Sequence, residues 1–322
     1  MKFDVVIGNP PYQQSSGGLA RSDTAKPFYQ NFMLRFMGGQ TRYLSFIIPA
    51  KWYTNNAHDC DKARSKTIKN LKILKDFPQA SEVFEDIQLS GGLCIYLWEH
   101  GYKGKTNFIQ VMGEDTYTSY DDISDSKLVI RYDIGRRVVA KVAHFKEMTL
   151  NEVSIVSSKF GIPTYERGEM ELPGQLKLRH SGGWGWASLI DVTRNIELIP
   201  LYKVIIGYKV PGGGLQKNHR YTVITIPQIL RKDEVCTDTY QVIGAFKDAE
   251  QAQNYMNYFK TKFVRFLMLM TQTNSSTTRD NYQLIPIQDF TINWTDEDLY
   301  KKYGLDNEEI EFIEKLIRPM FY

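Results

Sequence analysis

The sequence predicts an α/β protein with two lobes. Over roughly the first 145 residues, short apolar runs alternate with amphipathic segments, which is typical of a parallel-rich sheet with helices on its faces. From about residue 149 the pattern changes to strand-like runs separated by glycine-rich turns, which predicts mixed α+β structure. A chain of 322 residues with 42% apolar residues can bury two cores of moderate size.

The first lobe contains short apolar runs and two amphipathic segments. Apolar runs that end at turn residues predict strands at 4–8, 43–48, 93–98 and 106–112. Apolar residues at helical spacing predict helices over 28–37 and 59–74. Residues 5–7 are all apolar, so we expect the first strand to be covered on both faces.

The second lobe is predicted to contain short strands and one long helix. Strand-like runs occupy 203–208 and 221–226, and glycine-rich turns are expected at 182–186 and 211–214. Apolar residues that share a face predict a helix over 249–270, followed by a loop at 271–281. The chain ends in a helix-rich tail whose apolar residues need a burial site: Leu299, Tyr303, Ile310, Ile313 and Ile317.

The most informative segment is Asn-Pro-Pro-Tyr at residues 9–12, which follows the first strand directly. Pro10 and Pro11 stop any helix and make the turn rigid. Asn9 offers a side-chain carbonyl, the Pro10 carbonyl is a second acceptor, and Tyr12 has a ring on which a purine can stack. A structural Pro-Pro turn would explain the prolines but would leave their pairing with Asn9 and Tyr12 to chance. We therefore interpret the turn as a site for a flat exocyclic amine.

With this motif, the chain resembles the gamma group of adenine-specific DNA methyltransferases, particularly the large single-chain restriction and modification enzymes. The other segments that carry the resemblance occur in the family's order: 28–32, 43–49 with Trp52, 82–84, 90–98, 205–209 and 293–297. The resemblance implies a partial Rossmann-like methyltransferase sheet in residues 1–148. It further implies a DNA target-recognition domain in 149–290 and a helical tail in 291–322.

The resemblance also implies roles for individual residues. Asn9 and the Pro10 carbonyl would accept the two amino hydrogens of an adenine that has left the duplex, and Tyr12 would stack on its ring. Phe84 stands where the family has its second aromatic residue and would hold the other side of the base. A lone aromatic after a valine is equally common in cores, so an ordinary core position for Phe84 stays open.

S-adenosylmethionine is the cofactor that the resemblance implies. The family binds it through a glycine-rich turn and an acidic residue that precede the Asn-Pro-Pro-Tyr turn, whereas eight residues precede that turn here. We therefore expect cofactor binding to need a homodimer or a partner chain, and methylation by this chain alone is not expected. The strand at 4–8 would then be an apolar sheet edge that needs cover, with the tail as one candidate.

Duplex DNA is the expected macromolecular partner, although a net charge of +3 is too small to indicate it. Residues 198–232 contain no acid and carry the basic residues predicted to contact DNA: Lys203, Lys209, Lys217, Arg220, Arg231 and Lys232. The glycines at 212–214 lack the lysine and hydroxyl residue of a phosphate-binding loop, so a DNA-facing hairpin is expected.

Other chemistries have little support in the sequence. The five histidines are scattered and the three cysteines lack metal spacing, which disfavours zinc and nucleophilic sites. An odd cysteine count and the absence of an apolar leader or span fit a reducing cytoplasm. Two further interpretations stay open: a DNA-binding specificity module without catalysis, and a fragment of a methyltransferase that acts on small molecules or protein amides.

Overall fold

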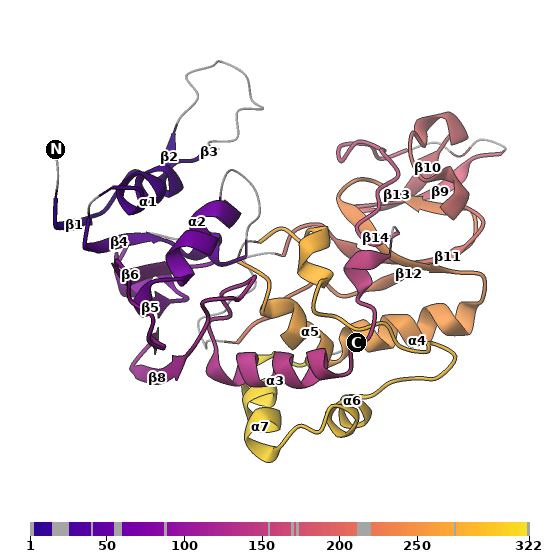
Figure 1. Ribbon diagram of the computed structural model, residues 1–322. Coiled ribbons are helices and arrows are strands. Elements are labelled where there is room, and N and C mark those ends of the chain that lie inside the picture. The colour runs from indigo at the N-terminus through magenta and orange to yellow at the C-terminus, as the bar shows by residue number, and fades with distance from the viewer. Residues whose placement is uncertain are drawn as a thin grey trace. The chain divides into compact units, whose positions relative to one another are not determined.

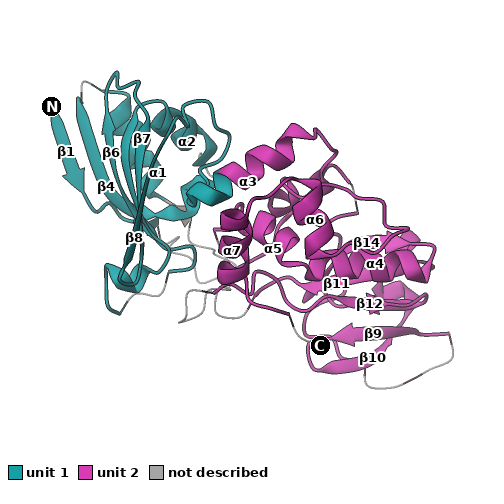
Figure 2. Ribbon diagram, turned by 90° about the horizontal axis from the view of Figure 1, so that it is seen from below, with its two compact units in different colours: residues 1–136 teal, residues 137–322 magenta. Residues whose placement is uncertain are grey.

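The structure is a computed structural model that describes residues 3–14, 26–39, 41–54, 60–86, 89–153, 155–168, 171, 174–210, 220–273 and 275–320. The chain divides into two compact units, residues 1–136 and 137–322, which are coloured separately in Figure 2. The division falls inside α3 (Asp133–His144), upstream of the domain boundary predicted after residue 148. Residues 291–322 lie in the same unit as the segment that precedes them.

Unit 1 is built on a six-stranded sheet with the order β1-β4-β6-β5-β7-β8 (Figure 1). Its strands are β1 (Val5–Gly8), β4 (Tyr43–Pro49), β5 (Leu71–Phe77), β6 (Leu93–Glu99), β7 (Thr106–Met112) and β8 (Asp115–Asp121). A separate two-stranded ribbon joins β2 (Gln13–Gln14) to β3 (Lys26–Pro27). The α/β class predicted from the sequence is confirmed.

The sheet is mixed, whereas the sequence pattern predicted a parallel-rich one. The pairs β1–β4 and β5–β7 are parallel, but β6 runs antiparallel to both of its neighbours, and β7–β8 is an antiparallel hairpin. Hairpin connections as short as the β7–β8 turn can only produce antiparallel neighbours. The alternation of apolar runs therefore located most strands but did not set their directions.

Two helices cover one face of this sheet. They are α1 (Tyr29–Met37) and α2 (Cys60–Ile68), and the core beneath them includes Leu44, Phe46 and Ile48 of β4. Side chains alternate between faces along a strand, so Val6, which lies beside Leu44, packs against this core. Val5 and Ile7 point to the opposite face and are 52% and 78% exposed. The prediction that β1 is covered on both faces is therefore wrong for the described part of the chain.

The predicted helix over 59–74 ends earlier than expected. Helix α2 stops at Ile68, and Leu71 begins β5. Apolar residues at 71, 74 and 77 satisfy helical spacing as well as a strand, so periodicity could not separate the two. Residues 71–77 form a strand because they pair with β6 on one side and β7 on the other.

Unit 2 contains two three-stranded sheets around a second core. One sheet has the order β12-β11-β14 and the other β10-β9-β13. The strands are β9 (Leu176–His180), β10 (Gly183–Ala187), β11 (Tyr202–Gly207), β12 (Gln228–Leu230), β13 (Glu234–Cys236) and β14 (Tyr240–Phe246). Their inward residues, among them Leu178, Ile205 and Val242, form one buried cluster.

Two sequence predictions in unit 2 need correction. Residues 221–226 do not form a strand, because Val223 has a φ of 69°, outside the extended region. Tyr221 instead pairs as an isolated bridge with Ile317 of the tail. The glycine-rich segment at 182–186 was expected to be a turn, yet all but its first residue lie in β10.

The long helix predicted over 249–270 is broken into α4 (Ala249–Lys260) and α5 (Lys262–Leu269). Thr261 leaves the helical region at the break, and its hydroxyl caps α5 by accepting a hydrogen bond from the Val264 amide. The Asp296 carboxylate accepts two more amides at this start, from Lys262 at 3.0 Å and Phe263 at 2.8 Å. Apolar periodicity continues across the break and so hides it.

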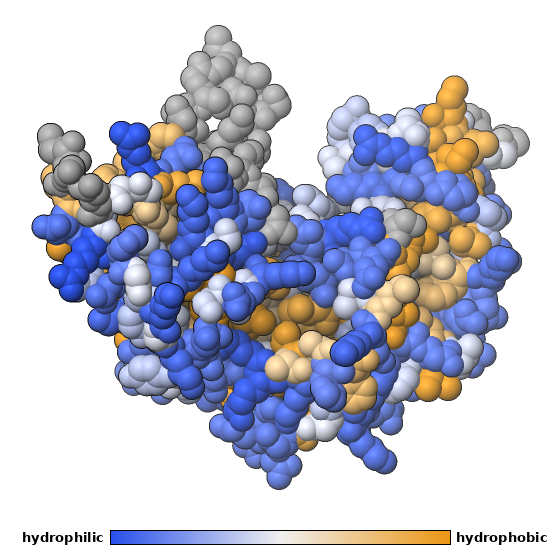
Figure 3. All heavy atoms as spheres, in the orientation of Figure 1, coloured by the Kyte–Doolittle hydropathy of each residue, from blue (hydrophilic) through white to orange (hydrophobic). Residues whose placement is uncertain are grey.

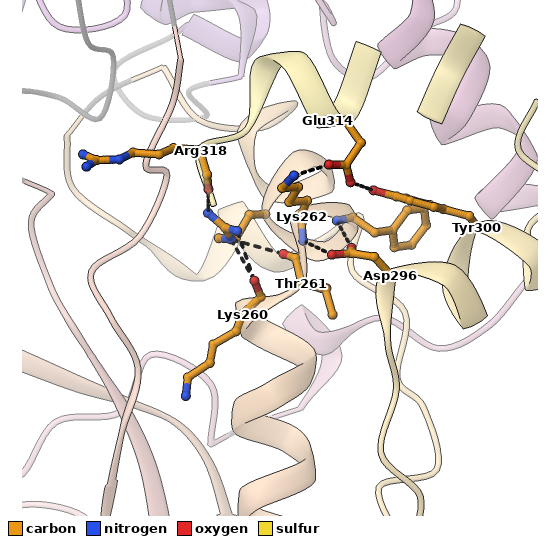
Figure 4. A network of polar contacts seen from close by, with 9 residues as sticks. Lys260, Thr261, Lys262, Asp296, Tyr300, Glu314 and Arg318 are labelled. Atoms are coloured by element: carbon orange, nitrogen blue, oxygen red, sulfur yellow. Dashed lines mark hydrogen bonds and ion pairs between the residues drawn. The ribbon is translucent and has the colours of Figure 1, made fainter. Parts of the chain in front are cut away.

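The tail packs onto this junction (Figure 4). Its helices are α6 (Asp296–Lys302) and α7 (Asn307–Leu316), and Tyr303 stacks on Phe263 with ring centroids 5.1 Å apart. The buried Arg265 donates to the carbonyls of Lys260, Thr261 and Arg318, which ties the end of the tail to both helices. Four of the five apolar tail residues singled out in the sequence are thereby buried inside unit 2: Leu299, Tyr303, Ile313 and Ile317.

Asp296 at the α4–α5 junction gives a stability test. Asp296→Ala removes the acceptor of two backbone amides and should lower the free energy of unfolding by about 1–2 kcal/mol. Glu297→Ala is the control, because Glu297 shares the first turn of α6 but touches no amide of α5, and it should cost about 0.5 kcal/mol or less. Urea denaturation followed by circular dichroism measures both, and equal losses would contradict the role given to Asp296.

Candidate functional site

The strand directions of unit 1 bring the segments with predicted function to one end of the sheet. Strand β1 runs parallel to β4, and β5 has the same direction because β6 lies antiparallel between β4 and β5. The residues that follow β1, β4 and β5 therefore leave the sheet at the same end. These are the Asn9–Tyr12 turn, the 3₁₀ turn η1 (Ala50–Tyr53), and the loop with η2 (Ala80–Glu82) and Phe84.

The Asn9–Tyr12 turn has an exposed residue at Asn9 and a buried one at Pro10. Asn9 is exposed, and neither its side chain nor the Pro10 carbonyl has a hydrogen-bond partner among the described residues. The Tyr12 carbonyl accepts the Phe28 amide at 3.0 Å, which holds the turn against the start of α1. An amino group that approached this turn would meet two acceptors whose hydrogen bonds are not already used.

Tyr12 contributes a ring rather than a reactive hydroxyl. The hydroxyl is buried and has no hydrogen-bond partner within the described part of the chain. Burial raises the pKa of Tyr12, and the nearby Cys94 raises it further. The phenol therefore stays neutral, and Tyr12 is half-buried.

Phe84 lies on the loop after β5 and is half-buried, so the structure leaves both a core role and a ligand role open. Its amide donates to the Ala80 carbonyl at 3.0 Å. Glu82 in the same loop accepts the Gly113 amide at 2.7 Å, which ties the loop to the β7–β8 turn. Between β1 and β5 lie β4 and β6, so the strand ends are three spacings, or roughly 14 Å, apart.

A buried polar cluster, which the sequence did not reveal, lies under these loops. Asp76 of β5 accepts hydrogen bonds from the Tyr53 hydroxyl at 2.9 Å and the Gln110 amide at 3.3 Å, and Arg131 lies 3.4 Å away. Arg131 also donates to the Gly91 carbonyl at 2.7 Å. Burial raises the pKa of Asp76, while Arg131, Tyr53 and Gln110 act in the opposite direction. The cluster joins β5 to β7, to η1 after β4 and to the segment before β6.

The basic residues predicted to contact DNA do not share one environment. Lys203 is fully buried and donates to the carbonyls of Ile199 at 3.0 Å and Arg231 at 2.8 Å, and burial lowers its pKa to about 8. Its ammonium group does not reach the surface, which does not fit the predicted role. Lys209, Arg231 and Lys232 are exposed, and Arg220 is half-buried. Lys217 and the glycines at 212–214 lie outside the described residues.

A surface that the sequence analysis did not select lies on β9 and β10. Lys177 and Arg179 alternate along one strand, and Trp184 and Trp186 along the other. The signal in the sequence was a two-residue alternation on both sides of a short turn, which predicts a hairpin with four outward residues.

The expected S-adenosylmethionine site would lie beyond β1. The family holds this cofactor with a glycine-rich turn and an acidic residue on strands beyond the one that precedes Asn-Pro-Pro-Tyr. In the described part of this chain, β1 is the last strand of the sheet on that side. Nor do three or more histidine, cysteine or carboxylate side chains gather as a metal site among the described residues. No helix in that part of the chain is long and apolar enough to cross a membrane.

Known proteins are similar in sequence to the part of unit 1 that contains these loops. Residues 1–84 match the Eco57I restriction-modification methylase family model. This stretch contains the Asn9–Tyr12 turn and Phe84. A Mycoplasma pneumoniae protein named "Uncharacterized adenine-specific methylase" is 39% identical over 108 residues, which are 33% of this chain and 26% of that protein. The resemblance to adenine-specific restriction-modification methylases is thus confirmed for the N-terminal part, and the chain spans about a quarter of this relative's length.

Two solved structures of restriction enzymes are loosely similar over most of the chain. The type IIG restriction endonuclease BpuSI aligns with a TM-score of 0.35 and 10% identity, covering 94% of this chain and 49% of that one. The type IIL restriction-modification enzyme MmeI, solved in complex with DNA, aligns with a TM-score of 0.49 and 8% identity, covering 97% and 53%. These alignments are too loose to bear on the function of this chain.

Gly92, directly before β6, allows a test of how tightly the site loops are packed. A Cβ atom there would lie 2.1 Å from the Phe77 carbonyl oxygen, at the end of β5. Gly101 has the same φ of 77° but open space around it. Gly101→Ala should cost about 1 kcal/mol of stability from backbone strain alone, and Gly92→Ala a further ~1–3 kcal/mol because the strand end must move. Thermal unfolding measures the difference, and equal costs would show that the loops yield freely.

Proposed function

We propose that this chain is the target-base-binding and DNA-reading part of a site-specific DNA adenine N6-methyltransferase of a restriction-modification system. The observation that carries the proposal is that the Asn9–Tyr12 turn and the Phe84 loop leave the sheet at the same end. The similarity of residues 1–84 to the Eco57I methylases and the adenine-specific relative support a DNA methyltransferase role. A cytoplasmic location is part of the proposal.

The proposed chemistry is positioning and electrostatic stabilisation. The lone pair of adenine N6 is conjugated with the ring, so the amine is a poor nucleophile. Asn9 and the Pro10 carbonyl would accept both amino hydrogens, which lets the nitrogen become pyramidal and stabilises positive charge on it. The ring of Tyr12 would stack on the extruded base, and Phe84 would cover its other side. Protons leave to solvent, and no strong base is needed.

In this proposal the cofactor half comes from outside the described sheet. Methylases of this family use S-adenosylmethionine in general, and we propose that a partner chain, another segment of a longer protein, or a second copy completes its site beside β1. The apolar edge of β1 supports this, because sheet edges are normally covered or protected by charge.

Lys209, Arg220, Arg231 and Lys232 of unit 2 remain candidates for phosphate contacts in double-stranded DNA. Their contribution would appear as a loss of affinity with rising salt, because each contact releases a counterion. The alternative function is a DNA-binding specificity module without catalysis. The acceptors at Asn9 and Pro10, which have no hydrogen-bond partner among the described residues, favour the methyltransferase, since DNA binding alone does not need them.

Asn9 gives the test of catalysis. In an assembly of this chain with a cofactor-binding half, Asn9→Ala should reduce transfer of labelled methyl groups to plasmid DNA by at least about 100-fold, with DNA affinity unchanged. Gln13→Ala, an exposed change just past the turn, should leave transfer intact, and Tyr12→Phe should be tolerated because stacking needs only the ring. Normal transfer by Asn9→Ala would contradict the proposed role of the turn. An assembly that binds DNA but transfers no methyl group would favour the specificity module.

The β1 edge gives the test of the missing half. Ile7→Lys places a charge on the exposed apolar strand and should abolish association with the completing half or with a second copy. Tyr120→Lys on β8 is the matched control, because β8 is the other edge of the sheet and Tyr120 is 60% exposed. Sedimentation velocity measures both variants. A wild-type chain that stays monomeric with any added half, or equal effects of the two changes, would contradict the assignment of this edge.

A further inference from the structure

The hairpin of β9 and β10 carries four outward side chains on one face. Trp184 lies opposite Arg179, and Trp186 lies opposite Lys177, in the antiparallel register. The alternate residues of both strands, such as Leu178 and Ala187, are buried in the core of unit 2. Hydrophobic residues lie beside hydrophilic ones on the surface of this part of unit 2, at the upper right of Figure 3. Trp184 itself is 45% exposed.

The two cations are held close to the Trp184 ring. The Lys177 ammonium lies 4.7 Å and the Arg179 guanidinium 5.7 Å from the ring centroid. Arg179 is fixed in place by hydrogen bonds to the Gln228 side chain at 2.9 Å and to the His180 and Gly183 carbonyls at 2.6 and 2.7 Å. Glu234 of β13 pairs with Lys177 in the register of the sheet, and one of its carboxylate oxygens already accepts the Arg231 amide at 2.7 Å.

A cavity of about 410 Å³ opens beside Trp184. Trp184, Trp186, His180 and Arg167 line it together with three glycines, and no carboxylate does. Lys177 and Arg179 do not line it. Its size lies within the range of small-molecule sites, and its lining combines flat apolar rings with nitrogen donors.

His180 lies on the buried face of β9, one position out of step with Lys177 and Arg179. It is 7% exposed, and its Nδ1 accepts the Gly182 amide at 3.1 Å. A backbone amide can only donate, so the proton of the neutral imidazole must be on Nε2. No hydrogen bond from Nε2 is found among the described residues, and His180 is one of the residues that line the cavity. The Arg167 guanidinium is held at the lining by the Thr164 and Glu166 carbonyls, at 2.9 and 2.8 Å.

We propose that this cavity binds an unstacked nucleobase of the DNA, with Trp184 as its stacking surface. The Arg167 guanidinium donates to acceptor atoms of the base, and Lys177 and Arg179 lie where they can neutralise neighbouring phosphates. Positive charge and the lack of a lining carboxylate match a polyanion that carries flat, acceptor-bearing rings. The inference rests on the proposed function, because it assumes that unit 2 contacts DNA, and it assigns that contact to a surface outside residues 198–232.

The test compares base-bearing and abasic single strands. Fluorescence anisotropy measures the affinity of the full chain for a labelled oligothymidylate and for an abasic oligomer of equal length and charge. The wild type should prefer the base-bearing strand about tenfold, and Trp184→Ala should remove this preference while leaving the abasic affinity unchanged. Trp184→Phe should retain most of the preference, and Ile190→Ala, an exposed apolar change in the same unit, should retain all of it.

Each contrary outcome has a separate meaning. A Trp184→Ala variant that prefers the base-bearing strand as strongly as the wild type would overturn the stacking assignment while leaving DNA binding in place. Equal losses on both strands would overturn it as well, because they would show a backbone contact or a folding defect. A wild-type chain that binds neither these strands nor duplex DNA would overturn the proposed function itself.

Discussion

The pairing of β4 with β1 on one side and β6 on the other is the constraint on which the rest of unit 1 depends. The parallel ladder to β1 makes Asn9 and the end of β4 leave the sheet together. Strand β6 runs antiparallel to β4, and β5 runs antiparallel to β6, so β4 and β5 have the same direction. The Phe84 loop after β5 therefore leaves the sheet at the same end as the Asn9–Tyr12 turn. A strand between β4 and β5 that ran the other way would place the two aromatic residues at opposite ends of the sheet.

The two edges of this sheet differ in a way that has functional consequences. Strand β8 reads Asp-Thr-Tyr-Thr-Ser-Tyr-Asp, and its polar and charged side chains keep the edge solvated. Strand β1 reads Val-Val-Ile-Gly, and Ile7 is 78% exposed. Complete burial of one such aliphatic side chain is worth about 1.5–3 kcal/mol. Cover for β1 would thus stabilise the sheet and place new residues beside the Asn9–Tyr12 turn at the same time.

Unit 2 holds two cations inside the protein, and one of them, Lys203, was predicted from the sequence to contact DNA. Lys203 and Arg265 each bind two or more backbone carbonyls inside the protein, and burial lowers the pKa of both. A buried cation is tolerated only where such acceptors replace water. The positive charge left at the surface is therefore distributed differently from the positive charge in the sequence, and Lys177 and Arg179 gain importance beside Trp184.

Local sequence determined the elements whose signals are self-contained. The strand before Asn9, the helix at 29–37 and the strands at 43–49, 93–99 and 106–112 were all predictable, because apolar periodicity and turn residues act over a few neighbours. The Asn-Pro-Pro-Tyr turn was recognisable for the same reason. Its two acceptors and its ring lie within four consecutive residues.

Only the tertiary structure decided what depends on distant partners. Leu71–Phe77 is a strand because β6 and β7 pair with it, and the helix after Ala249 breaks at Thr261 because Asp296, far along the chain, caps its second half. Likewise, burial of Lys203 depends on carbonyls of Ile199 and Arg231, and the cavity beside Trp184 requires His180 and Arg167 to meet in space. Hydrogen-bond partners and solvent exposure are set by long-range packing, so no local pattern in the sequence can specify them.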